Sequence, residues 1–213
     1  MAEEWQLIVQ RRMEGFHDLN MKAVKGQVCF AGSSLMEQFP IEEFVNELSG
    51  EKPIVYNRGL GGYTTIDMLK VVDVCVTELK PSKLFINIGT NDLSHPDWSL
   101  EEIMDRYEEI INIIERDVPG IKIYFMAYYP GNIEAAADYM KDVLAIRNND
   151  KIAEANKLVE KLAAKHGQRY IDVNDPLKDE YGRLKAEYSQ EGLHIKPEGY
   201  RAIFDEVLKY VME

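Results

Sequence analysis

The chain has 213 residues, of which 46% are hydrophobic and 29% charged, and this composition suits a globular protein with a large core. The formal net charge of -12 and the pI near 4.9 argue against nucleic acid or an anionic membrane surface as partners, because like charges repel. We therefore expect one domain over residues 1–213 that binds no nucleic acid.

The cysteines and the N-terminal residues bear on the cellular setting. Cys29 and Cys75 stand in apolar runs, which is typical of buried free thiols and not of a disulfide framework or a metal site. The N-terminal residues are acidic and lack the basic and apolar regions of a signal peptide. No apolar run approaches the roughly 18 residues that a membrane helix needs. These features predict a cytoplasmic protein without a membrane span.

Strand and helix patterns alternate along the chain. Apolar residues at helical spacing predict an N-terminal helix within residues 1–25 that covers the domain. Short apolar runs predict five strands, at residues 27–31, 54–57, 84–88, 121–127 and 170–173. Further helices are expected at residues 64–79, 99–118, 148–165 and 197–212. The alternation predicts an α/β fold, a single-domain three-layer α/β/α sandwich around a five-stranded parallel sheet, with its ligand site beyond the carboxyl ends of the strands.

The first predicted strand runs into the sequence Gly-Ser-Ser-Leu at residues 32–35. A serine at this place, Ser33 or Ser34, would begin a helical turn at the edge of the sheet. Its backbone N–H would point outward with the positive end of the helix dipole, which suits a nucleophile. The alternative is a serine that only caps the helix, and for this loop alone capping is the more common role.

Two further strand ends carry possible ligand-binding groups. Gly59, Gly61 and Gly62 follow the second strand, where glycine lets a backbone N–H approach a ligand. Their spacing fits neither a dinucleotide loop nor a phosphate loop, so we expect no cofactor. Asn91 follows the third strand, where its amide could donate to a developing oxyanion. Each loop could equally be a plain turn.

The last loop pairs an acid with a histidine. Glu191 precedes His194 by three residues, and Pro197 can start the helix that follows. A carboxylate at this separation could select the tautomer of the imidazole and stabilise its protonated form, although an ordinary surface turn has the same appearance. Glu198 could join Glu191 and His194 as a third ligand of a metal ion. No further histidine or cysteine has a useful spacing, so we expect no metal.

Together the loops supply a serine, a glycine N–H, an asparagine amide and a histidine, which are the groups that acyl transfer requires. The chain resembles the SGNH hydrolases, the superfamily of GDSL-type esterases, lipases and acylhydrolases, over nearly its whole length and with all four sequence blocks in order. The resemblance implies a flavodoxin-like fold and a catalytic site built from five residues: Ser34 as nucleophile, Gly62 and Asn91 as oxyanion donors, His194 as base and Glu191 as its carboxylate.

Two positions depart from the family pattern. Ser33 stands where the Gly-Asp-Ser-Leu block usually has an aspartate, a residue that mainly supports the local structure. Glu191 stands where the Asp-x-x-His block has an aspartate, and its side chain is one methylene longer. We expect Ser33 to make a shorter local hydrogen bond and Glu191 still to reach His194.

The resemblance implies hydrolysis of a small-molecule carboxylic ester, with a short acyl or O-acetyl group, through an acyl-enzyme intermediate. The sequence has no long apolar lid pattern, which favours short and soluble substrates. A thioesterase or lysophospholipase with the same site is one alternative, and a non-catalytic binding domain that retains the fold is another. The sequence is compatible with a homo-oligomer.

Several residues near the predicted site have two interpretations. His95 either contacts substrate or lies on the surface. The others either line an acyl or sugar pocket or belong to the core: Tyr63, Trp98, Tyr128, Tyr129 and Ile195.

Overall fold

The structure, a computed structural model, describes residues 2–213, with side chains from residue 7 onward. A parallel sheet of five strands forms its centre, in the order β2-β1-β3-β4-β5. The strands are β1 (Val28–Gly32), β2 (Val55–Gly59), β3 (Lys83–Asn87), β4 (Lys122–Met126) and β5 (Arg169–Ile171). This order is that of flavodoxin-like folds, so the predicted fold class is confirmed.

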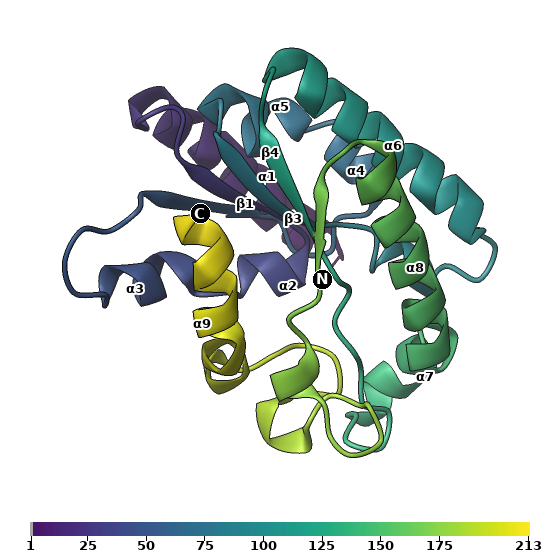
Figure 1. Ribbon diagram of the computed structural model, residues 1–213. Helices are drawn as coiled ribbons and strands as arrows, with labels where there is room; N and C mark the ends of the chain where they lie inside the picture. The colour runs from purple at the N-terminus through teal and green to yellow at the C-terminus, as the bar shows by residue number, and fades with distance from the viewer. Residues whose placement is uncertain (1) are drawn as a thin grey trace.

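Helices cover both faces of the sheet (Figure 1). Contacts among buried side chains place five helices on one face: α1 (Ala2–Lys22), α4 (Thr65–Leu69), α5 (Val72–Cys75), α6 (Leu100–Asp117) and α8 (Asn149–Lys165). The other face carries α2 (Ser34–Glu37), α3 (Ile41–Asn46) and α9 (Pro197–Met212). Among the described helices, none is long and apolar enough to cross a membrane.

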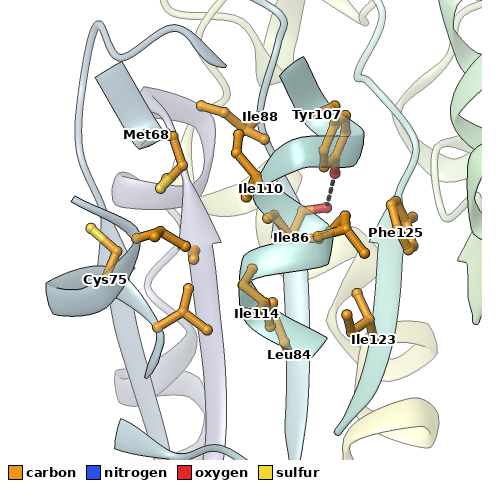
Figure 2. Packing of buried hydrophobic residues seen from close by; sticks show 14 of the residues in the cluster. Met68, Cys75, Leu84, Ile86, Ile88, Tyr107, Ile110, Ile114, Ile123 and Phe125 are labelled. Carbon is orange, nitrogen blue, oxygen red and sulfur yellow. Dashed lines mark hydrogen bonds between the residues drawn. The ribbon is translucent and has the colours of Figure 1, made fainter. Parts of the chain in front are cut away.

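Side chains alternate between two cores along each strand, as the period of a strand requires. Figure 2 shows the first core, where Leu84 and Ile86 of β3 pack against Ile110 of α6. The Tyr107 hydroxyl donates to the carbonyl oxygen of Ile86 at 3.4 Å, so the polar end of this buried ring has a partner. In the second core the rings of Phe30 and Phe85 stack on neighbouring strands at 4.5 Å between centroids.

Cys29 and Cys75 both lie in the first core as free thiols, as predicted. The Cys29 thiol donates to the carbonyl oxygen of Cys75 at 3.4 Å. Burial raises the pKa of Cys29 to about 12, so this thiol stays protonated at neutral pH.

The prediction of one continuous helix over residues 64–79 is wrong. The segment is broken into α4, α5 and a 3-10 turn, Thr77–Leu79. Its apolar spacing persists, because Met68, Val72 and Cys75 are all buried. The helix breaks at Val71, whose φ is −134°, in a stretch rich in β-branched valines that are stiff in a helix.

The pairing register of β1 with β2 and β3 places the carboxyl ends of these three strands at the same level of the sheet. Gly32, the last residue of β1, pairs with Gly59 at the end of β2 and with Asn87 at the end of β3. The loops that follow these strands therefore emerge side by side at the carboxyl edge of the sheet.

Candidate active site

Ser34 is the first residue of α2, two residues beyond the end of β1. The turn depends on Gly32, whose φ is 153° and whose position would place a Cβ 2.1 Å from the carbonyl oxygen of Asn87. Any side chain there would therefore push β1 away from β3. Ser33 follows as the N-cap residue, and its N–H donates to the same oxygen at 3.3 Å.

The Ser33 side chain does not cap the helix by a hydrogen bond. It is 1% exposed, and its hydroxyl has no hydrogen-bond partner among the described residues, so the local hydrogen bond expected of it is not formed. Ser34, in contrast, is partly exposed and turns its hydroxyl toward the last loop.

That last loop is a tight, internally bonded turn. Ser189 and Ile195 form an antiparallel bridge at its base, and the N–H of Gln190 donates to the carbonyl oxygen of His194 at 2.9 Å. Gly192 sits at its tip with a φ of 99°, where a Cβ would lie 2.7 Å from the Cβ of Ala136. Only glycine combines this conformation with such close packing, so the neighbouring segment holds the loop in place.

The loop directs the His194 ring between an acid and a hydroxyl. Nδ1 of the ring lies 2.6 Å from Oε1 of Glu191, and Nε2 lies 3.0 Å from Oγ of Ser34. The same Oε1 accepts the backbone N–H of His194 at 3.2 Å. With its proton on Nδ1, the ring presents the lone pair of Nε2 to the Ser34 hydroxyl, which is the arrangement of a general base beside a nucleophile.

Gly62 and Asn91 lie at the neighbouring strand ends and line the same cleft as Ser34 and His194. Asn91 Nδ2 donates to the carbonyl oxygen of Tyr63 at 2.9 Å, which uses one of its two amide hydrogens. Within the described part of the chain, the backbone N–H groups of Ser34 and Gly62 have no acceptor. Two backbone N–H groups and one amide hydrogen at this cleft are therefore free to donate, and a site that binds an anionic oxygen needs donors of this kind.

Asp92 ties the loop that carries Asn91 to the loop that carries Gly62. Its buried carboxylate accepts the N–H of Thr65 at 3.0 Å and also the hydroxyl of that residue. Arg106 lies 3.5 Å from the same carboxylate. Because Thr65 begins α4, three residues after Gly62, this contact joins the segment that follows Gly62 to the loop that carries Asn91.

The cleft has a volume of about 470 Å³, and some of the side chains that line it belong to no sequence motif described above. Met140 and Val143 reach it from α7 (Asp138–Ile146), and Arg147 follows that helix. The apolar spacing of Met140, Val143 and Leu144 is helical and could have revealed α7, whereas Arg147 stands in no recognisable motif. A larger hollow of about 650 Å³ beneath α1 contains none of the five predicted site residues.

The structure shows which of the residues with two interpretations lie at the cleft and which belong to the core. His95 is exposed, lines the cleft and stacks on Trp98 at 4.0 Å between ring centroids. Tyr128, Tyr129 and Ile195 are fully buried core residues. Tyr63 and Trp98 are partly buried and pack against the first core. Among the described residues, no group of three or more His, Cys, Asp or Glu side chains is arranged to hold a metal ion.

Comparison with known proteins gives one family match. The model of the GDSL-like lipase/acylhydrolase family matches residues 31–202, which contain all five predicted site residues. The N-acylneuraminate cytidylyltransferase of Escherichia coli is 27% identical over 131 residues, which make up 60% of this chain. The chain covers 28% of that protein's own length.

Solved structures agree with the family match. A Streptococcus pneumonia protein, provisionally assigned as a platelet activating factor, has a TM-score of 0.85 and 31% identity, covering 99% of this chain and 96% of its own. A GDSL-like lipase from Bacteroides thetaiotaomicron has a TM-score of 0.75 and 18% identity, with coverage of 94% and 97%. A catalytic mutant of an acetylxylan esterase from Geobacillus stearothermophilus has a TM-score of 0.67 and 15% identity, with coverage of 89% and 96%. At their low identity, the last two show a shared fold.

Proposed function

Because the chain belongs to the GDSL-like lipase/acylhydrolase family, we propose that it hydrolyses carboxylic esters with short acyl or O-acetyl groups through an acyl-enzyme intermediate. The observation that carries the proposal is the continuous series of contacts from Ser34 through His194 to Glu191. The activity is proposed to reside in one domain over residues 1–213. The buried free thiols support a cytoplasmic setting.

In the first step, Ser34 Oγ forms a bond to the ester carbonyl carbon while His194 Nε2 takes the hydroxyl proton. Glu191 holds the ring and stabilises its positive charge. The negative charge on the carbonyl oxygen is received by the N–H groups of Ser34 and Gly62 and by the amide of Asn91. The ester C–O bond then breaks, and the proton on Nε2 passes to the leaving alcohol.

In the second step, water attacks the acyl-enzyme while His194 takes one of its protons. The bond between the acyl carbon and Ser34 Oγ breaks, and the serine recovers its proton from Nε2. The products are a carboxylic acid and the free enzyme, and no cofactor takes part.

Substrate size is proposed from the walls of the cleft. Met140, Val143 and Leu193 are the apolar side chains beside the site, and together they offer a small surface to an acyl group. An acetylxylan esterase occurs among the proteins of similar fold, and its name refers to an acetylated carbohydrate. An O-acetylated carbohydrate is therefore our preferred substrate class.

A panel of esters from acetyl to long-chain acyl, with a thioester and a lysophospholipid, tests the proposal when it is run beside Ser34→Ala. We expect the highest kcat/KM on acetyl esters, and a loss of roughly 10³-fold or more in Ser34→Ala. A preference for the thioester or for long acyl chains would favour the alternative enzymes. No turnover by the folded protein would favour a binding domain.

A further inference from the structure

Arg147 is a buried cation at the edge of the proposed oxyanion site. It caps the C-terminal end of α7 and is 1% exposed, although part of its side chain borders the cleft. Its Nη1 donates to the carbonyl oxygen of Thr90 at 2.7 Å and lies 3.5 Å from Oδ1 of Asn91. Among the described residues, its buried Nε and Nη2 atoms have no hydrogen-bond partner.

No carboxylate of the described residues lies within 4.0 Å of this guanidinium, so its charge is not neutralised by an ion pair. Burial lowers the pKa of Arg147 to about 10, an effect that the charge of Glu191 partly opposes, and the group stays protonated at neutral pH. A buried cation without a counterion is unfavourable for folding. Stability alone therefore gives no reason for an arginine at this position.

The contacts of Asn91 supply a reason. Its amide lies between Arg147, which can only donate, and the Tyr63 carbonyl, which can only accept. Oδ1 must therefore face the guanidinium, and Nδ2 must face the carbonyl. One hydrogen of Nδ2 binds that carbonyl, and the other is left for the cleft. If the amide were reversed, its oxygen would face the developing oxyanion and repel it.

We propose that Arg147 is a positioning residue for catalysis, which fixes the Asn91 amide so that its N–H points to the oxyanion and adds a permanent positive charge behind it. This inference rests on the proposed esterase function. Because Nε and Nη2 are buried and Nη1 is engaged, the guanidinium acts through Asn91 and does not bind an anionic group of the substrate.

A double-mutant cycle of Arg147→Met and Asn91→Ala tests the proposal, with a neutral acetyl ester and an acetyl ester that carries a carboxylate. We expect Arg147→Met to lower kcat about 10- to 100-fold on both esters with KM changed less than about threefold, since the lost interaction is made in the transition state. In the Asn91→Ala background the same change should lower kcat less than about threefold. Arg147→Lys should recover part of the loss because it keeps the charge.

Leu144→Ala is the matched control, because Leu144 is buried on the same helix and does not border the cleft. We expect it to lower the melting temperature and to change kcat less than about threefold. Arg147→Met should keep its melting temperature within a few degrees of the wild type, because removing the buried charge offsets the lost hydrogen bonds.

Four results would overturn the inference. Additive losses in the cycle would show that Arg147 does not act through Asn91. A loss confined to KM for the carboxylate-bearing ester would make Arg147 a substrate-binding residue. Unchanged kcat in Arg147→Met, with an active wild type, would overturn this inference alone, whereas an inactive wild type would overturn the proposed function and this inference with it.

Discussion

One oxygen of Glu191 accepts two hydrogen bonds from His194, one from ring Nδ1 and one from the backbone N–H. Glutamate has one methylene more than aspartate. The tight loop accommodates it because the side chain curls toward His194, three residues further along the chain. Glu191 as a whole residue is 9% exposed, so little water competes for its carboxylate. Glu191, one of the two residues that depart from the family pattern, thus has the contacts needed to orient the ring.

Replacing the acid tests this role. We expect Glu191→Gln to lower kcat about 10²- to 10⁴-fold, because a neutral amide can present an N–H to Nδ1 and so favour the wrong tautomer. Steady-state kinetics on an acetyl ester would measure the loss, and circular dichroism would check the fold. A kcat within fivefold of the wild type would show that the acid does not orient His194.

Ser33 and Ser34 are adjacent, and only Ser34 contacts His194. We expect Ser33→Ala to keep activity within about tenfold, because the Ser33 hydroxyl makes no hydrogen bond to another described residue. The kcat of Ser33→Ala, compared with that of Ser34→Ala, measures the difference. Loss of turnover in Ser33→Ala, with activity kept in Ser34→Ala, would exchange the roles of the two serines.

At the scale of the elements, the strands were predictable and the short helices were not. Buried parallel strands appear in the sequence as continuous apolar runs, so the five predicted strands lie within three residues of the observed ends. The helices α2 and α3 have four and six residues, too few to show a helical period. The break at Val71 was hidden because its apolar spacing continues across it.

The candidate site likewise has a part that the sequence predicts and a part that it does not. The blocks at residues 32–35, 59–62, 89–92 and 191–194 have composition cues at strand ends or at a helix start, and the structure brings them to one cleft. Arg147 has no such cue. Its partners are a backbone carbonyl and a side chain 56 residues away, and such a contact depends on tertiary structure that no local pattern encodes.

The contact of Asp92 with Thr65 joins two of these elements, and its removal should loosen both. We expect Asp92→Ala to reduce the free energy of unfolding by about 2 to 4 kcal/mol, because it leaves a buried N–H and hydroxyl of Thr65 without their acceptor. Urea denaturation would measure the change. Asp92→Asn is the matched control, since its Oδ1 can still accept, and an equal midpoint for Asp92→Ala and the wild type would contradict this role.

At the scale of the whole molecule, the sheet assembles the site from distant parts of the chain. Ser34 and His194 are 160 residues apart in sequence, yet their side chains lie within hydrogen-bond distance. Loops from β1, β2 and β3 meet because these strands end in register, and α9 begins just after the histidine loop. The geometry of the candidate site therefore depends on the packing of both cores.

The reactivity of the two buried thiols depends on that packing. We expect iodoacetamide at pH 8 to leave Cys29 and Cys75 unmodified in the native protein and to alkylate both in denaturant, because burial keeps the thiols protonated and inaccessible. Mass spectrometry of the two samples would measure the modification. Rapid alkylation of the native protein would contradict the observed core.

The raised pKa of Cys29 also predicts how stability changes with pH. The thiol ionises near 9.0 in the unfolded chain and at about 12 in the folded one, so its stabilising contribution is complete below pH 9 and is lost as the pH rises toward 12. Denaturation midpoints across this range should fall less in Cys29→Ala than in the wild type. An equal fall in both proteins would contradict the shift.

The central claim is that Ser34 is a nucleophile activated by His194, and covalent labelling tests it most directly. A fluorophosphonate reacts with an activated serine hydroxyl, and peptide mass spectrometry then locates the adduct. We predict one adduct, on Ser34, in the wild type, much slower labelling in His194→Ala and no labelling in Ser34→Ala. An unlabelled wild type that is fully folded, or an adduct on Ser33, would contradict the claim.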